Sequence, residues 1–281
     1  FCRLRRHPVA IKIVFANHKG GIGKTTSVLN TSSFLSLMGK KVLCMDFDPQ
    51  SNLTISFGID IISLPVSLLE VFLGKVSINE SIVSVYPNLD IVPARTDLSK
   101  IPASDFVVNH FRKNEIIKYK IKEIDDVYDF ILMDTSSSKD VVNLLTVNCL
   151  SFSDYVIVPI QFEHFAVAGL AQQMDIIKDV RDQWLNPELK LLGIVGTFFQ
   201  NTNNNRYHHD MVRNTNAGRF LFETKIRRNT ALSVSVSKGL PITHFDRTCN
   251  GYLDYYSFTV EMLKRLNIEG GVIDHERTIA V

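Results

Sequence analysis

The stretch KGGIGKTT, residues 19–26, decides the fold because of what stands on either side of it. An apolar run over Ala10–Ala16 precedes it, and a helical pattern over Thr25–Met38 follows it. Glycines let the loop curl with its N–H groups turned inward, which makes a nest for anionic oxygens. Lys24 adds a point charge for terminal phosphates, and the Thr25 hydroxyl is placed to ligate Mg²⁺. The order of strand, loop and helix predicts a nucleotide site rather than a simple turn.

The loop departs from the strict phosphate-loop pattern at one position. His18 stands where the pattern has its first glycine, and an extra lysine, Lys19, follows it. We assign the nucleotide contacts to the loop and to the start of the helix. These residues are Lys19, Gly20, Gly21, Ile22, Gly23, Lys24, Thr25 and Thr26.

Apolar, β-branched runs alternate with helical patterns along the chain. This alternation predicts a doubly wound α/β fold, in which helices cover both faces of a mostly parallel sheet. The expected strands are Ala10–Ala16, Lys41–Asp46, Leu89–Val92, Phe130–Asp134, Tyr155–Pro159 and Leu191–Phe199. The expected helices are Thr25–Met38, Ala103–Ile124, Asp140–Leu150, Ala166–Trp184, Asp210–Gly218 and Gly251–Leu266. We predict a P-loop NTPase fold, with residues 10–281 as a single domain and residues 1–9 as an N-terminal extension.

The composition narrows the class of protein. With 281 residues, 45% of them apolar, the chain can bury a sizeable core, and its formal net charge of +2 is only mildly basic. That balance does not indicate a dedicated nucleic-acid binder, although it permits a local basic patch. The four cysteines are scattered without a Cys-x-x-Cys pair, which predicts a reducing cytoplasm and no disulfides. No apolar run approaches the roughly 18 residues of a membrane span, and no signal peptide is recognisable.

Acids follow two of the expected strands. Asp46 and Asp48 come at the end of the second strand, and Asp134 ends the apolar run at residues 130–133, a Walker B pattern. The carboxyl ends of parallel strands form the ligand crevice of such a sheet, so these acids are expected to face the phosphate loop. Carboxylates there can hold Mg²⁺ or its waters, or orient an attacking water. The alternative for each is a polar turn, with Asp48 capping at Pro49.

The early lysine and the segment Asp46-Phe47-Asp48-Pro49-Gln50 together resemble the ParA/MinD family of P-loop ATPases. Further matching stretches lie at residues 153–159, 161–163 and 168–170, so that the resemblance covers about residues 11–266. The family implies ATP and Mg²⁺ as cofactors and a sandwich homodimer in ATP. In such a dimer, Lys19 reaches across to the phosphates of the partner.

The resemblance also implies roles for single residues. Asp48 becomes the acid that positions water, and Asp46 supports the metal shell. The catalytic set is then Lys19, Lys24 and Asp48, and the metal set is Thr25, Asp46, Asp48 and Asp134. The family usually has two prolines shortly after the Walker B acid, but here residues 135–139 read TSSSK. This departure concerns the second switch and leaves the metal site intact.

A charged stretch at residues 225–232 is the candidate DNA surface, because lysines and arginines displace counterions from phosphates. A solvated face is the alternative interpretation. Partition ATPases of the family carry Ile-Pro-Arg-Asn-x-Arg-Leu here, which implies DNA contact and a place for Asn229 in the base pocket. Arg228 and Asn229 match that pattern, whereas Arg227 replaces the proline and Ala231 the second arginine. The residues assigned to DNA are Arg219, Arg227, Arg228 and Lys238.

The leading hypothesis is a ParA-type ATPase for plasmid or chromosome partitioning. The resemblance implies nonspecific DNA binding in ATP, a ParB-like centromere-binding partner that stimulates hydrolysis, and a cytoplasmic protein that is nucleoid-associated when ATP-bound. The alternative is a MinD-like ATPase on a membrane surface, but the terminal tail over Asn267–Arg277 has glycines and acids rather than a basic amphipathic helix. An iron–sulfur reductase is a third class, and it would need two suitably placed cysteines per chain where only Cys149 lies near the second switch.

Overall fold

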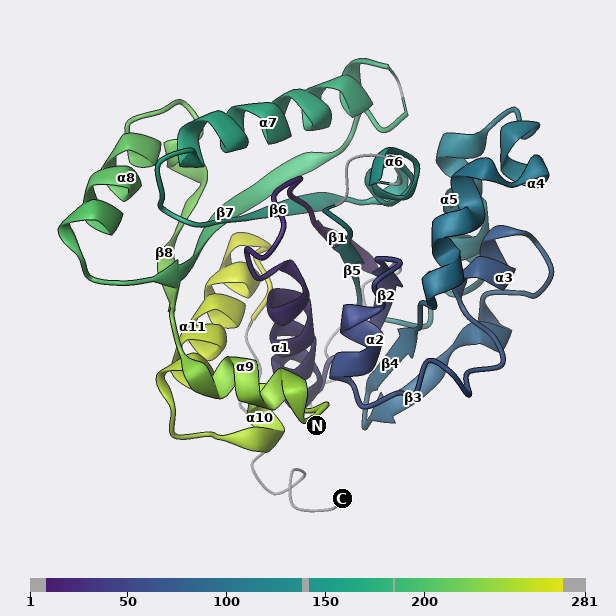
Figure 1. Ribbon diagram of the computed structural model, residues 1–281, viewed down its shortest axis with the longest axis horizontal. Coiled ribbons are helices and arrows are strands. Elements are labelled where there is room, and N and C mark those ends of the chain that lie inside the picture. The colour runs from purple at the N-terminus through teal and green to yellow at the C-terminus, as the bar shows by residue number, and fades with distance from the viewer. Residues whose placement is uncertain (1–8, 138–141, 184, 270–281) are drawn as a thin grey trace.

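The structure is a computed structural model that describes residues 9–137, 142–183 and 185–269 (Figure 1). Its strands are β1 (Ile11–Phe15), β2 (Val42–Phe47), β3 (Val83–Tyr86), β4 (Leu89–Val92), β5 (Phe130–Thr135), β6 (Tyr155–Ile160), β7 (Lys190–Phe199) and β8 (Leu221–Arg227). The α-helices are α1 (Lys24–Leu37), α2 (Asn52–Ser56), α3 (Leu68–Phe72), α4 (Asp105–Val108), α5 (Ile116–Lys120), α6 (Val142–Phe152), α7 (Ala166–Asp182), α8 (Asn203–Arg213), α9 (Thr230–Ser237), α10 (Ile242–Phe245) and α11 (Asn250–Arg265). Short 3₁₀ helices are η1 (Asn79–Ser81), η2 (Thr96–Ala103), η3 (Lys113–Glu115), η4 (Ile121–Glu123) and η5 (Gly218–Phe220).

The strands form one eight-stranded sheet in the order β3-β4-β2-β5-β1-β6-β7-β8. The hairpin strand β3 runs antiparallel to β4, and the other paired strands of the described chain run parallel. From β1 the chain passes through α1 to β2 on one side, whereas β6 lies on the other side of β1. This reversal opens a crevice at the carboxyl ends of the central strands, where doubly wound sheets bind their ligands.

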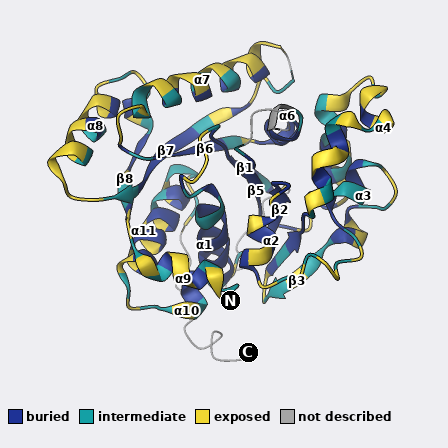
Figure 2. Cartoon of the chain, in the orientation of Figure 1, coloured by how far each residue is buried: buried dark blue, intermediate teal, exposed yellow. Residues whose placement is uncertain are grey.

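Each face of the sheet has its own hydrophobic core, because side chains alternate between the two faces along a strand. Val14, Met45 and Met133 belong to the core beneath α3, α5, α6 and α7. Phe15 and Leu132 belong to the other core, beneath α1 and α11. Figure 1 shows these two sets of helices on opposite sides of the sheet, and Figure 2 shows buried strands beneath helices whose outer surfaces are exposed. The doubly wound α/β fold is confirmed.

Helix α1 is buried on nearly all sides although many of its residues are polar. Two of its polar side chains have partners on the C-terminal helices: Asn30 Oδ1 accepts from the Ile242 N–H at 2.8 Å, and the Ser27 and Tyr255 hydroxyls lie 3.2 Å apart. Buried polar groups paired in this way stabilise the fold, whereas unpaired ones would cost about 1–3 kcal/mol each. These contacts fix the helix whose first turn carries the nucleotide-site residues.

The six expected strands are confirmed, each within one residue of its bounds. The helix expected over Ala103–Ile124 is wrong, because that stretch is broken into α4, η3, α5 and η4. Ser104 caps α4, which ends after about one turn at Asn109. The helix expected over Asp210–Gly218 instead runs from Asn203 to Arg213.

Two strands, β3 and β8, were not predicted from the sequence. Strand β3 is a four-residue hairpin strand. Strand β8 is an edge strand that carries Glu223, Lys225 and Arg227, and charged residues are common on such edges. Residues 1–8 of the expected extension, residues 138–141 of the second switch and residues 270–281 of the tail lie outside the described residues.

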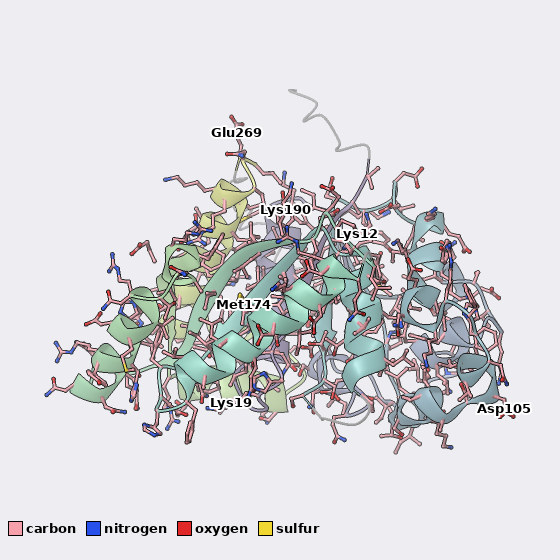
Figure 3. The ribbon with its side chains drawn as sticks, turned by 90° about the horizontal axis from the view of Figure 1, so that it is seen from above. Lys12, Lys19, Asp105, Met174, Lys190 and Glu269 are labelled. Carbon is pink, nitrogen blue, oxygen red and sulfur yellow. The ribbon has the colours of Figure 1, made fainter. Side chains whose placement is uncertain are left out.

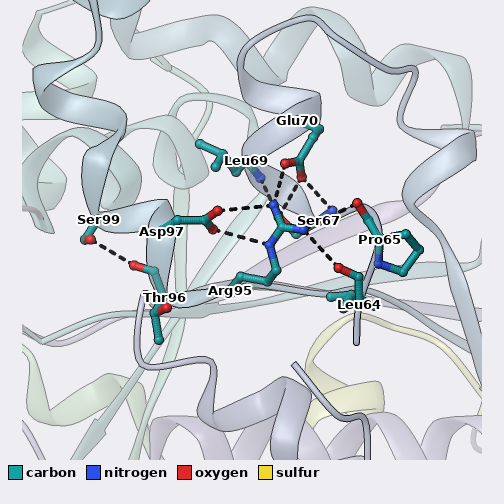
Figure 4. Close-up of polar contacts among 9 residues, drawn as sticks. All are labelled: Leu64, Pro65, Ser67, Leu69, Glu70, Arg95, Thr96, Asp97 and Ser99. Atoms are coloured by element: carbon teal, nitrogen blue, oxygen red, sulfur yellow. Dashed lines mark hydrogen bonds and ion pairs between the residues drawn. The ribbon is translucent and has the colours of Figure 1, made fainter. Parts of the chain in front are cut away.

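Past the end of β4, Arg95 joins three segments of chain (Figure 4). Its Nη2 lies 2.5 Å from Glu70 Oε1 on α3 and 3.2 Å from Asp97 Oδ2. Its Nη1 donates to the Leu64 carbonyl at 2.9 Å and to the Pro65 carbonyl at 3.4 Å. The side chains of Arg95 and Glu70 are only 20% and 19% exposed, so solvent screens the ion pair weakly.

We expect Arg95→Met to lower the free energy of unfolding by about 2 kcal/mol, because it leaves a partly buried Glu70 carboxylate without its cation. The free energy of unfolding of Arg95→Lys should lie between those of Arg95→Met and the unchanged chain, since lysine keeps the charge but lacks the forked donors. Urea unfolding measures both, with Arg181→Met on the exposed face of α7 as the control. A loss equal to that of the control would contradict a stabilising role for this cluster.

Candidate functional site

The phosphate loop joins β1 to α1 and curves around one ammonium group. Gly21 and Gly23 have φ angles of 69° and 83°, a left-handed conformation that glycine adopts without strain. Lys24 Nζ donates to the carbonyl oxygens of Asn17 at 3.0 Å and Lys19 at 3.1 Å, so it lies inside the curve of the loop. Gly23 provides no side-chain cap for α1, and the first-turn N–H groups of the helix therefore remain suited to anionic oxygens.

Neighbouring strands brace this loop from outside. Asn17 Nδ2 donates to the Pro159 carbonyl at 2.8 Å, at the end of β6. The buried Thr197 hydroxyl on β7 lies within hydrogen-bond distance of the carbonyls of Ile22, at 2.8 Å, and Ile160, at 3.0 Å. The sequence analysis missed Thr197, since a threonine inside an apolar strand carries no signal of its contact with a distant loop.

Asp134, at the end of β5, faces the start of α1. Its Oδ2 accepts a hydrogen bond from the Thr25 hydroxyl at 2.6 Å, whereas its buried Oδ1 has no hydrogen-bond partner among the residues that the structure describes. Asp46 stands beside it in register, on β2. Burial, followed by the charge of Asp46, raises the pKa of Asp134 well above its usual value, although Thr25 and Lys24 act against the shift. Burial also lowers the pKa of Lys24, against the nearby charges of Asp134 and Asp48. The site therefore holds an unpaired acceptor in a region short of positive charge.

These residues fit Mg²⁺ with a nucleotide phosphate. Mg²⁺ in such sites takes one or two protein oxygens, and phosphate oxygens and waters complete its shell. Thr25 Oγ1 and the unpartnered Asp134 Oδ1 supply oxygens of that kind. In the described part of the chain, no three His, Cys, Asp or Glu side chains converge as a self-sufficient metal site. The structure brings Thr25 and Asp134 together as expected.

The two acids at the carboxyl end of β2, Asp46 and Asp48, differ in their surroundings. Asp48 is buried, with its Oδ1 accepting from the Gln50 N–H at 2.9 Å. The charge of Asp48 acts to raise the pKa of both Lys24 and Asp134, so Asp48 lies close to both residues. Asp46 is completely buried, and both of its oxygens accept hydrogen bonds. Its Oδ1 accepts from the Asp48 N–H, and its Oδ2 accepts from the N–H and hydroxyl of Thr54 on α2. Burial raises the pKa of Asp46 to about 6, while the bonds from Thr54 and Asp48 act to lower it.

Lys19 lies at the surface of the site. Figure 3 shows it at the edge of the molecule opposite Lys12 and Lys190, which lie toward the amino ends of β1 and β7. Its Nζ is 3.0 Å from Glu163 Oε2, and the two side chains are 48% and 53% exposed. An exposed ion pair of this kind contributes at most about 1 kcal/mol, so Lys19 can exchange Glu163 for a stronger anion.

A cavity of about 240 Å³ adjoins the phosphate loop at Gly23 and Thr26. Asn229 lines it and caps α9, with its Oδ1 accepting from the Ala231 N–H at 2.8 Å. The sequence pattern could not identify Phe198, which also lines the cavity and holds a φ of 51° that is rare outside glycine. The structure therefore places Asn229 beside a cavity next to the phosphate loop.

The residues assigned to DNA do not form one patch. Arg219 precedes β8 and Arg227 ends it, so a strand of seven residues, about 20 Å long, separates them. Arg227 is bound to Asp254, with its Nη2 2.6 Å from Oδ1 and its Nε 3.0 Å from Oδ2. Arg228 and Lys238 are exposed near α9. Arg219 instead lines a polar cavity of about 730 Å³ with Arg213, His209 and Glu223.

Comparison with known proteins supports an ATPase family. A family model described as an AAA domain matches residues 10–191. The chain is 35% identical over 257 residues to the chromosome-partitioning ATPase Soj of Treponema pallidum, covering 90% of this chain and 97% of that protein. It is 32% identical over 258 residues to the chromosome partitioning protein ParA of Caulobacter vibrioides, covering 90% and 94%.

Solved structures agree with this relationship. A putative plasmid partition protein of Borrelia burgdorferi B31 bound to AMPPNP superposes with a TM-score of 0.74 at 25% identity, over 92% of this chain and 98% of that one. Cobyrinic acid a,c-diamide synthase of Mycobacterium smegmatis, with a bound ATP analogue and magnesium, superposes with a TM-score of 0.79 at 30% identity. The match covers 95% of this chain and 100% of that one. Together with the loop, the two lysines and the Thr25–Asp134 pair, these matches show that the chain belongs to the ParA/Soj-type family of P-loop ATPases.

Proposed function

We propose that this protein is a partitioning ATPase that hydrolyses Mg²⁺-bound ATP between two copies of the chain. The observation that carries the proposal is the buried Asp134 carboxylate, which has one oxygen on Thr25 and the other without a partner in the described ranges of the chain. Such a carboxylate is costly in the ligand-free chain and is satisfied by a hydrated cation. The named relatives are partitioning proteins, which supports the biological role.

The residues of this chain would divide the work as follows. Backbone N–H groups of the loop and of the first turn of α1 bind phosphate oxygens, and Lys24 moves from the loop carbonyls to the terminal phosphates. Thr25 and Asp134 hold Mg²⁺, which supplies charge neutralisation at the phosphates. Asp48 orients the attacking water. Asn229 and its cavity receive the base.

Lys19 supports the homodimer. Its side chain is half-exposed and paired with the exposed carboxylate of Glu163, so a second copy could present a phosphate to it. A cation that contacts the reacting phosphate only in the closed dimer would make hydrolysis slow until a ParB-like partner favours closure. The domain bounds of 10–281 and the cytoplasmic, nucleoid-associated location belong to this proposal.

The MinD-like alternative predicts binding to a membrane surface. None of the helices in the described part of the chain has the length and hydropathy that a membrane span requires. Co-sedimentation with anionic liposomes in ATP would favour this alternative.

The iron–sulfur alternative depends on Cys149. Cys149 is fully buried, and burial raises the pKa of its thiol well above the usual value, as expected for a core cysteine rather than a cluster ligand.

Lys19→Ala should bind ATP about as well as the unchanged chain, because a single site keeps Lys24 and its nest. Turnover stimulated by DNA and the partner should fall at least about tenfold, because the charge that stabilises the closed state is lost. A steady-state ATPase assay with and without DNA and the partner measures this, and Lys75→Ala is the surface control. Unchanged stimulated turnover in Lys19→Ala would refute the dimer mechanism.

For DNA, we propose that Arg213 and Arg219 at the polar cavity contact phosphates, along with Arg228 and Lys238. Arg227 is already neutralised by Asp254 and should contribute little. Each contacting arginine replaced by alanine should weaken binding of nonspecific duplex in ATP and reduce the slope of log K against log salt by about 1. Fluorescence anisotropy over a salt series tests this, with Arg181→Ala as the control. An absence of binding at low salt would exclude the DNA role.

A further inference from the structure

The carboxylate of Asp46 joins the catalytic loop to the sheet. Asp46 is the penultimate residue of the parallel strand β2 and is completely buried. Its Oδ1 accepts from the Asp48 N–H at 3.0 Å, and its Oδ2 accepts from the Thr54 N–H at 2.9 Å and the Thr54 hydroxyl at 2.7 Å. Both oxygens are therefore engaged by donors of this chain.

The hydroxyl of Thr54 extends this connection to the neighbouring strand. It donates to Asp46 and accepts from the N–H of Ala94 at 2.9 Å, just past the end of β4. A hydroxyl has one proton to donate, so accepting from Ala94 while donating to Asp46 fixes its direction. Thr54 is fully buried, so its hydroxyl is shielded from bulk solvent.

We propose that Asp46 and Thr54 form a buried staple that positions Asp48, and that Asp46 is a positioning residue rather than a Mg²⁺ ligand. The staple closes residues 47–53, the segment that carries Asp48. Asp46 holds both ends of this segment, because Asp48 at its start and Thr54 just after its end both donate to the Asp46 carboxylate. This inference rests on the proposed function, in which Asp48 orients water, and it revises the place of Asp46 in the expected metal set.

The chemistry of the staple favours a positioning role. Hydrogen bonds to a carboxylate are roughly twice as strong as neutral ones, and here three of them converge on one buried group. A valine at position 54 would keep the shape of threonine, yet it would leave the Ala94 N–H unpaired and Asp46 without its shortest bond. A shift of about 1 Å in a group that orients a reactant can cost on the order of 100-fold in rate.

The first test uses the ligand-free chain and needs no ATPase activity. Hydrogen exchange at the amides of Asp48 and Ala94 should be about tenfold faster in Thr54→Val, because the staple opens more often. Thr54→Ser should restore the slow exchange. Ser56→Ala is the matched control, since it removes a buried hydroxyl from the same helix that donates to the Asn52 carbonyl within that helix, at 2.6 Å. Unchanged exchange at Asp48 in Thr54→Val would overturn the staple.

The second test separates positioning from metal binding. Thr54→Val and Asp46→Asn should each lower kcat by about tenfold with KM for ATP unchanged, and the double variant should be no slower. The Mg²⁺ concentration for half-maximal activity should not move in either variant. A raised Mg²⁺ requirement in Asp46→Asn alone would assign Asp46 to the metal. If the chain showed no ATPase activity, the proposed function would fail, while the exchange measurement would still decide the staple.

Discussion

Much of this structure depends on one electrostatic constraint, the burial of acidic side chains beside a single lysine at the carboxyl edge of the sheet. Asp134 and Asp46 are neighbours in register on adjacent strands, and both are completely inaccessible. Burial opposes the charge on these acids and on Lys24. Asp46 is satisfied internally by its staple, but Asp134 keeps an oxygen for which the described residues provide no hydrogen-bond partner. The described part of the ligand-free chain therefore holds a buried acceptor that is suited to an added cation.

Two features of the surface, Lys19 and a polar cavity at the edge of the sheet, lie outside this buried cluster of charges. Lys19 lies at the surface beside these buried charges, where it pairs with the exposed Glu163 and remains accessible to a second molecule. Away from this site, the sheet ends in an edge strand with a polar cavity that collects Arg213 and Arg219. Arg227, at the far end of that strand, is taken up by Asp254 on α11. The proposed DNA contacts therefore lie partly at this edge of the sheet, at Arg213 and Arg219, and partly near α9, at Arg228 and Lys238.

The sequence predicted the central strands and the phosphate loop because each depends on local patterns of apolar and glycine residues. It also placed Thr25 and Asp134 correctly, since acids at the ends of parallel strands converge on one edge. It failed over Ala103–Ile124, where scattered apolar residues imitated one helix. Thr54 and Thr197 were missed because their importance lies in long-range hydrogen bonds to Ala94 and Ile22, which no spacing reveals. The pairing of Arg227 with Asp254 was invisible for the same reason.

The most direct measurement is the thermal unfolding of the unchanged chain and of Asp134→Asn, with Mg²⁺, ATP or both. Because the folded pKa of Asp134 is raised, its carboxyl costs stability as the pH rises above the ordinary value of 3.8. Asp134→Asn should therefore be at least as stable as the unchanged chain without ligand at pH 8, with the difference vanishing in acid. Only the unchanged chain should gain further stability when Mg²⁺ is added to ATP. An equal gain in Asp134→Asn would contradict the account.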